Sequence, residues 1–131
     1  MKRYAFICIG GALGAILRFI LKNIDIYGSY GNFPVNTLLI NVTGSFLLAF
    51  ILAAAEEVAG IDRDIRLGVT VGFLGAYTTF STICGETVIL FTSGHIPTGM
   101  IYITLSVILG MIAAYSGVLL AQKVVRVKGE V

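Results

Sequence analysis

The side chains best suited to chemistry in this chain are hydroxyls and amides set within apolar stretches. Four hydroxyls surround Phe80 and belong to Thr78, Thr79, Ser81 and Thr82. Hydroxyls donate hydrogen bonds without carrying charge, and the edge of a phenyl ring is electropositive. A lining of such groups suits a small anion better than a cation.

Motifs for enzymatic chemistry are absent from the sequence. It has no Ser-His-Asp set, no phosphate-binding glycine loop, no HExxH motif and no paired carboxylates. Its one histidine, His95, precedes Pro97 in a short loop and is expected to be solvated. Cys8 and Cys84 occur singly, without metal-ligand spacing, and are expected to be packing residues. We therefore expect no enzyme activity.

Polar residues recur at helical spacing in two further stretches. Thr37, Asn41 and Ser45 are four residues apart, and so are Tyr102 and Ser106, which places each set on one face of a helix. The amide of Asn41 either bonds one helix to another or lines a path as a hydrogen-bond donor. The second interpretation is favoured because other stretches share the polar face.

Two charges complete the candidate residues. Glu86 is the one acid within the apolar stretches, and Arg18 lies near the end of the first. An acid inside a membrane is a functional hypothesis by default; alternatively, Glu86 pairs with a basic or hydroxyl group at the membrane edge. Arg18 either extends its charge to the membrane surface, which is favoured, or recruits anions at a mouth.

Four apolar stretches must position these residues. The chain of 131 residues is 57% hydrophobic and 12% charged, which is typical of an integral membrane protein. We expect an all-α protein with a single four-helix transmembrane domain over 1–131, its helices at about 4–22, 36–56, 66–92 and 98–123. The start Met1-Lys2-Arg3 also fits a secretory signal, but a retained first helix is favoured because the apolar run continues past its small residues.

The third stretch has two interpretations. Gly68, Gly72 and Gly75 loosen its first half before the hydroxyl cluster, which predicts a helix broken near its centre. Free carbonyls of Gly75 and Thr78 would then suit a cation such as sodium, and free N–H groups after the break would suit an anion. Otherwise the helix is unbroken, glycines form a packing face, and each hydroxyl bonds to its own backbone.

The distribution of charge gives the orientation. Four crossings place both termini on one side, with seven basic residues: Lys2, Arg3, Arg63, Arg66, Lys123, Arg126 and Lys128. Arg18 and Lys22 lie on the other side, so the positive-inside rule predicts cytoplasmic termini. The net charge of +2 is too small to indicate a nucleic-acid partner.

A partner chain is expected from size. Four helices leave no room for a lined conduit, so polar faces on three of them must meet something other than lipid. The pairs Gly10 with Gly14 and Gly68 with Gly72 would allow the close approach that such an interface needs.

Three motifs occur in order along the chain: GGALGAILRF at 10–19, NTLLINVTGSF at 36–46 and GFLGAYTTFSTICGET at 72–87, followed by a fourth span with Tyr102 and Ser106. In these motifs and their spacing the chain resembles the Fluc (CrcB) fluoride channels along almost its whole length. The resemblance implies a passive, fluoride-selective channel of the bacterial inner membrane that exports fluoride. It also implies an antiparallel, dual-topology homodimer in lipid, with two pores and one central structural sodium ion at the dimer interface.

The resemblance also implies roles for residues. The implied fluoride pathway is lined by Thr37, Asn41, Thr79, Phe80, Ile83, Tyr102 and Ser106, sodium is held by the backbone carbonyls of Gly75 and Thr78, and Arg18 and Glu86 have vestibule or support roles. Three positions depart from the family pattern. Ile83 replaces the second phenylalanine of an aromatic pair, Gly110 replaces a polar residue, and Asn36 stands where a glycine is frequent.

Alternatives remain for the assembly and for the function. The bias of basic residues also fits a heterodimer with a homologous chain of opposite topology. Two other functions are a small proton-coupled drug exporter that uses Glu86 and a non-transporting membrane assembly subunit. Such exporters generally place their acid in the first span, where this chain has none.

Overall fold

The computed structural model describes residues 1–24, 33–57 and 62–129, with the backbone alone at 56–57 and 126–129. Regular structure in these ranges is helical. The elements are α1 (Lys2–Asn23), α2 (Val35–Glu57), α3 (Arg63–Leu67), the π-helix η1 (Gly68–Leu74), α4 (Gly75–Tyr77), α5 (Phe80–Thr92) and α6 (Ile96–Gly129).

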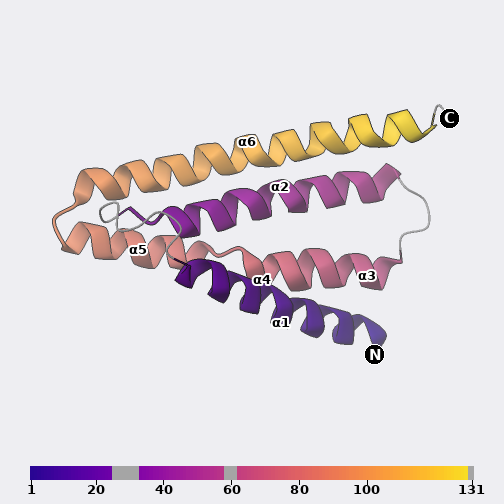
Figure 1. The fold of residues 1–131 in the computed structure, drawn as a ribbon, viewed down its shortest axis with the longest axis horizontal. Helices are drawn as coiled ribbons and strands as arrows, with labels where there is room; N and C mark the ends of the chain where they lie inside the picture. The colour runs from indigo at the N-terminus through magenta and orange to yellow at the C-terminus, as the bar shows by residue number, and fades with distance from the viewer. Residues whose placement is uncertain (25–32, 58–61, 130–131) are drawn as a thin grey trace.

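Four helical segments in the described residues are long and apolar enough to cross a membrane: Lys2–Asn23, Val35–Ala55, Arg63–Thr92 and Ile96–Val125. Each begins and ends within a few residues of the range expected from sequence. Both ends of the chain lie at the same end of the bundle (Figure 1), as an even number of crossings requires. The side chains of Arg126 and Lys128, which contribute to the expected charge bias, lie outside those described.

The helices lie side by side in the order α6, α2, third span, α1 (Figure 1). The most extensive contacts join α2 to α6 and α1 to η1. Many large apolar side chains are exposed on the protomer, among them Phe19, Met111 and Tyr115. In a membrane such side chains face lipid or a second chain, because lipid tails are as apolar as they are.

Glycines bring α1 against η1. Gly10 and Gly14 are buried, and a Cβ at either position would overlap the carbonyl of Gly68 or Phe73. A Cβ at Gly72 would lie 2.6 Å from the carbonyl oxygen of Ile7. The expectation that these glycines serve an interface with a partner chain is wrong, because their small surfaces are already used within the protomer.

The third span is interrupted at two residues. Thr78 has φ −79° and ψ 156° and Thr79 has φ −153° and ψ 121°, so both are extended rather than helical. Helix α5 begins after them, with the Thr79 hydroxyl accepting a hydrogen bond from the Thr82 N–H at 3.2 Å. The helix is therefore broken, as the first interpretation of the sequence predicts. The unbroken alternative is wrong, although Thr78 does bond to its own helix at the Leu74 carbonyl.

Two apolar clusters fix the span on either side of this break. Leu74 and Tyr77, before it, pack with Ile40 of α2. Leu90, after it, packs with Leu38 of α2 and Tyr102 of α6. Because α2 contributes to both clusters, it holds the two halves in register.

Candidate functional site

Asn41 bridges α2 to the break. Its Nδ2 donates to the Thr79 carbonyl at 2.9 Å, and its Oδ1 accepts from the Thr79 N–H at 2.7 Å. The side-chain amide thus supplies both partners that Thr79 lacks outside a helix, as backbone in a membrane requires. An Asn side chain has two amide hydrogens, and one remains for another acceptor.

Gly44 lets α2 come close enough for this bridge. A Cβ at Gly44 would overlap Cγ2 of Thr78 and lie 3.2 Å from Cδ1 of Tyr77. Nearby, the Thr43 hydroxyl and the Tyr77 hydroxyl are 3.0 Å apart and share a hydrogen bond. The contact of Gly44 with the break emerges only from the fold.

A pocket of about 280 Å³ opens beside the break. Its polar lining is Asn41, Ser45, Thr78, Thr79 and Ser106, and its apolar lining is Phe80, Ile83, Ile103 and Val107. Five of these residues were expected in the pathway: Asn41, Thr79, Phe80, Ile83 and Ser106. The fold therefore gathers three distant segments around one space.

The pocket holds more hydrogen-bond donors than its internal contacts use. Thr79 Oγ1 lies 3.2 Å from Ser81 Oγ and 3.0 Å from Thr82 Oγ1. Three hydroxyl hydrogens thus serve two contacts, so at least one is left to donate. The Ser106 hydroxyl instead donates within its own helix, to the Tyr102 carbonyl at 2.7 Å. Of the three hydroxyl residues, Thr79 lines the pocket, as does Asn41 with its remaining hydrogen, so these two side chains are the candidate donors for a guest.

Thr37 and Tyr102 lie elsewhere, at the carboxylate of Glu86. Thr37 Oγ1 donates to Oε1 at 2.9 Å and the Tyr102 hydroxyl donates to Oε2 at 2.7 Å. Lys22 Nζ lies 3.3 Å from Oε1. Thr37 and Tyr102 are 2% and 0% exposed, and neither is among the residues that line the pocket at Asn41. One carboxylate therefore joins residues of α1, α2, α5 and α6.

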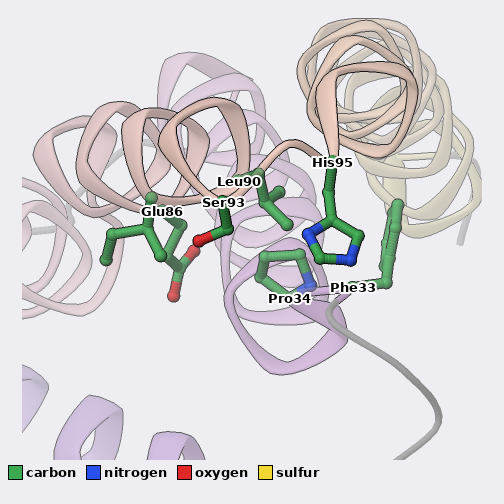
Figure 2. Close-up of a pocket in the computed structure, with 7 residues that line it drawn as sticks. Phe33, Pro34, Glu86, Leu90, Ser93 and His95 are labelled. Carbon is green, nitrogen blue, oxygen red and sulfur yellow. The ribbon is translucent and has the colours of Figure 1, made fainter.

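A second pocket, of about 540 Å³, reaches Glu86 from the connection between α5 and α6. Figure 2 shows Glu86 at one side of this pocket and His95 and Phe33 at the other. Both pockets border α5, the first near its beginning and the second along its later part. The polar groups therefore follow α5 from Thr79 to the Glu86 cluster and on to the end of the bundle.

Arg18 stands apart from both clusters. It is partly buried, and within the described parts of the chain its side chain forms no hydrogen bond or ion pair. Lys22, four residues later, is the cation that reaches Glu86. From sequence, Lys22 counted as one of two charges on its side of the membrane. Its spacing from Arg18 signalled a shared helix face, but only the fold identifies its partner.

Two backbone carbonyls lose their helical donors at the break. In a continuous helix the Thr79 N–H would bond to the Gly75 carbonyl, and the Thr82 N–H to the Thr78 carbonyl. Here the first bonds to Asn41 Oδ1 and the second to Thr79 Oγ1. Gly75 is exposed. These two oxygens are the ones expected from sequence to bind a cation.

Comparison with known proteins gives consistent matches over most of the chain. Residues 5–118 match the family described as CrcB-like protein, Camphor Resistance (CrcB). A protein of Methylococcus capsulatus named "Fluoride-specific ion channel FluC" is 43% identical over 118 residues, which are 89% of this chain and 51% of that protein. The chain thus spans about half the length of that relative.

Two further relatives carry the same name and match along nearly their whole length. The protein of Sulfurihydrogenibium sp. is 36% identical over 124 residues, which are 93% of this chain and 98% of the relative. That of Thermus thermophilus is 39% identical over 118 residues, 89% of this chain and 93% of the relative.

Proposed function

The chain belongs to the CrcB family, and from this premise we propose that it is a fluoride-specific ion channel, as its relatives are named. It is a multi-pass membrane protein with four candidate spans. As a channel it catalyses no reaction. We place it in the bacterial inner membrane, where it would let fluoride leave the cytoplasm passively.

The observation that carries this proposal is the pocket of neutral donors at the break. Fluoride is a small ion that accepts strong hydrogen bonds, so uncharged N–H and O–H groups can replace part of its water shell. Asn41, which keeps a free amide hydrogen, and Thr79, whose hydroxyl lies beside those of Ser81 and Thr82, line the pocket and would supply such groups. The edge of the Phe80 ring adds a weakly positive surface. With Ile83 at the next turn of α5, Phe80 supplies this edge alone.

The open pocket supports an assembly of two chains. Phe80 is 77% exposed and Val107 56% exposed, although both line the pocket. Polar groups facing lipid there would lack partners, at a cost of several kcal/mol each by order of magnitude. We infer that a second copy in antiparallel orientation closes the pocket, which gives two equivalent paths per dimer.

A structural sodium ion between the copies fits the backbone at the break. The Gly75 and Thr78 carbonyls are hard oxygen ligands without helical donors, and they carry the partial negative charge of a helix end. A bound sodium ion would supply positive charge to balance them. The Thr79 N–H bonds to Asn41 Oδ1 and the Thr82 N–H bonds to Thr79 Oγ1. These two hydrogen bonds leave the Gly75 and Thr78 carbonyls available to a cation.

Arg18 completes the proposal as a vestibule residue. Its charge has no partner within the described residues, and it lies one helical turn before Lys22, which reaches Glu86. A cation there would raise the local concentration of fluoride before it enters the path.

A fluoride electrode on liposomes that contain the purified protein tests the function. The liposomes hold potassium fluoride, and valinomycin balances charge. We expect fast fluoride efflux without a proton gradient, and much slower efflux of chloride under matched conditions. Efflux that requires a proton gradient would instead support an exporter that uses Glu86. If folded protein gives no fluoride efflux, the result would support a non-transporting assembly subunit.

A further inference from the structure

A carboxylate beside an anion path is an electrostatic obstacle. The side chain of Glu86 is 19% exposed and lines the pocket that opens toward the end of the bundle (Figure 2). Thr37 and Tyr102 donate hydrogen bonds to it, which fixes its position. Those donors are neutral, however, so they do not cancel its charge. An uncompensated charge at this point repels fluoride.

Lys22 supplies the missing positive charge. Its Nζ lies 3.3 Å from Glu86 Oε1, and the lysine side chain is 47% exposed. The other ion pair in the described ranges, Arg3 with Asp64, lies at the far end of α1. At the Glu86 pocket, therefore, Lys22 is the cation paired with the acid among the residues described.

The position of Lys22 depends on Asn36. Helix α1 ends at Asn23, and its last carbonyls need donors from outside the helix. Asn36 Nδ2 lies 3.2 Å from the carbonyl oxygens of Leu21 and Lys22 and 2.8 Å from that of Ile24. This contact fixes the end of α1 to the beginning of α2, one residue before Thr37. A glycine at position 36 has no side chain for this contact.

We propose that Lys22 is an entry residue of the anion path, whose ammonium neutralises Glu86, and that Asn36 is the positioning residue that holds it there. The proposal rests on the proposed channel function. It assigns a purpose to a lysine that motif comparison did not single out, and to the asparagine that departs from the family pattern. Anion entry then depends on the charge at position 22 and not on its packing.

The test compares variants by initial fluoride efflux per protein in liposomes. Lys22→Arg keeps the charge and is expected to stay within about twofold of the parent chain, whereas Lys22→Met is expected to lose about tenfold. Lys22→Glu adds a second negative charge and is expected to lose about another tenfold. Lys2→Met is the matched control, since it removes the same charge from the other end of α1, and is expected to leave efflux unchanged.

Ionic strength separates an electrostatic role from a packing role. Raising an impermeant salt from about 0.1 M to about 1 M shortens the screening length from about 10 Å to about 3 Å. The gap between Lys22→Met and the parent chain is then expected to narrow several-fold. Asn36→Gly is expected to lower efflux about threefold and to make Lys22→Met less harmful in the same chain.

Three results overturn the proposal: efflux from Lys22→Met within twofold of the parent, equal losses in the Met and Glu variants, or a loss that salt does not change. Size-exclusion profile and thermal unfolding in detergent identify variants that fail to fold, for which Lys22→Gln replaces Lys22→Met. A parent chain that passes no fluoride would refute the channel function itself. If the parent chain conducts fluoride and the Lys22 variants conduct it equally well, only the proposed role of Lys22 would be refuted.

Discussion

At the scale of single residues, Asn41 combines a structural role with a proposed binding role. Its amide replaces both backbone partners of Thr79 and keeps one hydrogen that these bonds do not use, and Asn41 also lines the pocket. An unpaired buried backbone group costs about 1–3 kcal/mol, so any change at Asn41 affects the break as well as the path. Substitutions here must therefore be compared with a residue that lines the pocket without bridging.

Asn41→Asp tests the donor. The carboxylate can still accept from the Thr79 N–H but cannot donate to the Thr79 carbonyl or to fluoride, and it adds a negative charge. We expect fluoride efflux to fall at least about tenfold. Ser45→Ala, in the same pocket, is the control and is expected to remain near the parent rate. Undiminished efflux from Asn41→Asp would remove Asn41 from the path.

Phe80 and Ile83 test the single-ring arrangement. Phe80→Ile removes the ring edge that lines the pocket, and we expect an efflux loss of about tenfold because a weakly positive surface is replaced by an apolar one. Ile83→Phe is expected to change efflux little, since one ring already serves. A marked gain in throughput from Ile83→Phe would show that two rings are needed.

At the scale of elements, the broken third span depends on neighbours as much as on its own residues. Thr79 caps α5 through Thr82, α2 packs against both halves of the span, and α1 packs against η1. The backbones of α1 and η1 approach closely because glycines, which have no side chains, lie where the two helices cross. The π-helix η1 is the part of the third span that has the most extensive contact with α1.

Two adjacent glycines of α1 test this packing. A Cβ at Gly10 would overlap the Gly68 carbonyl, whereas one at Gly11 would lie at an ordinary 3.9 Å from the Gly72 carbonyl oxygen. We expect Gly10→Ala to cost about 1–3 kcal/mol, because backbone must move to accept it. Gly11→Ala is expected to be near neutral. Thermal unfolding in detergent measures both, and equal midpoints would contradict the close contact.

At the scale of the whole molecule, one protomer leaves its site open. The pocket at the break is lined by exposed Phe80 and Val107, and both termini lie at one end of the bundle (Figure 1). An antiparallel pair would place basic termini on both sides of the membrane, against the bias of basic residues toward one side. The orientation of the chains in the membrane therefore decides between a homodimer and a heterodimer.

Single-cysteine labelling in intact cells measures that orientation. We expect a cysteine placed beside Met1, in a chain whose Cys8 and Cys84 are replaced by alanine, to react with an impermeant maleimide in about half of the molecules. Purified protein is expected to have twice the mass of one chain by light scattering. Labelling in none or all of the molecules would instead indicate one fixed orientation and a homologous partner of opposite topology.

Much of this protein could be predicted from local properties of its sequence. The spans follow from the length of each apolar run, because a bilayer has a fixed thickness. Glycines and hydroxyls in adjacent turns indicated a break as one of two interpretations, between which the backbone at Thr78 and Thr79 decides. The residues of the pocket at Asn41, Thr79, Phe80 and Ser106 follow from motif and spacing. These features depend on neighbours in the chain, so the order of residues is enough to indicate them.

The tertiary structure alone decided which polar residues meet. It brings Thr37 and Tyr102 to Glu86, 49 and 16 residues away in the chain, and pairs Lys22 with the same carboxylate. It also turns the glycines of α1 and η1 toward each other and not toward a partner chain. Each outcome depends on how whole helices rotate and cross. Packing between distant segments determines this arrangement, and the helical periodicity of one segment cannot specify it.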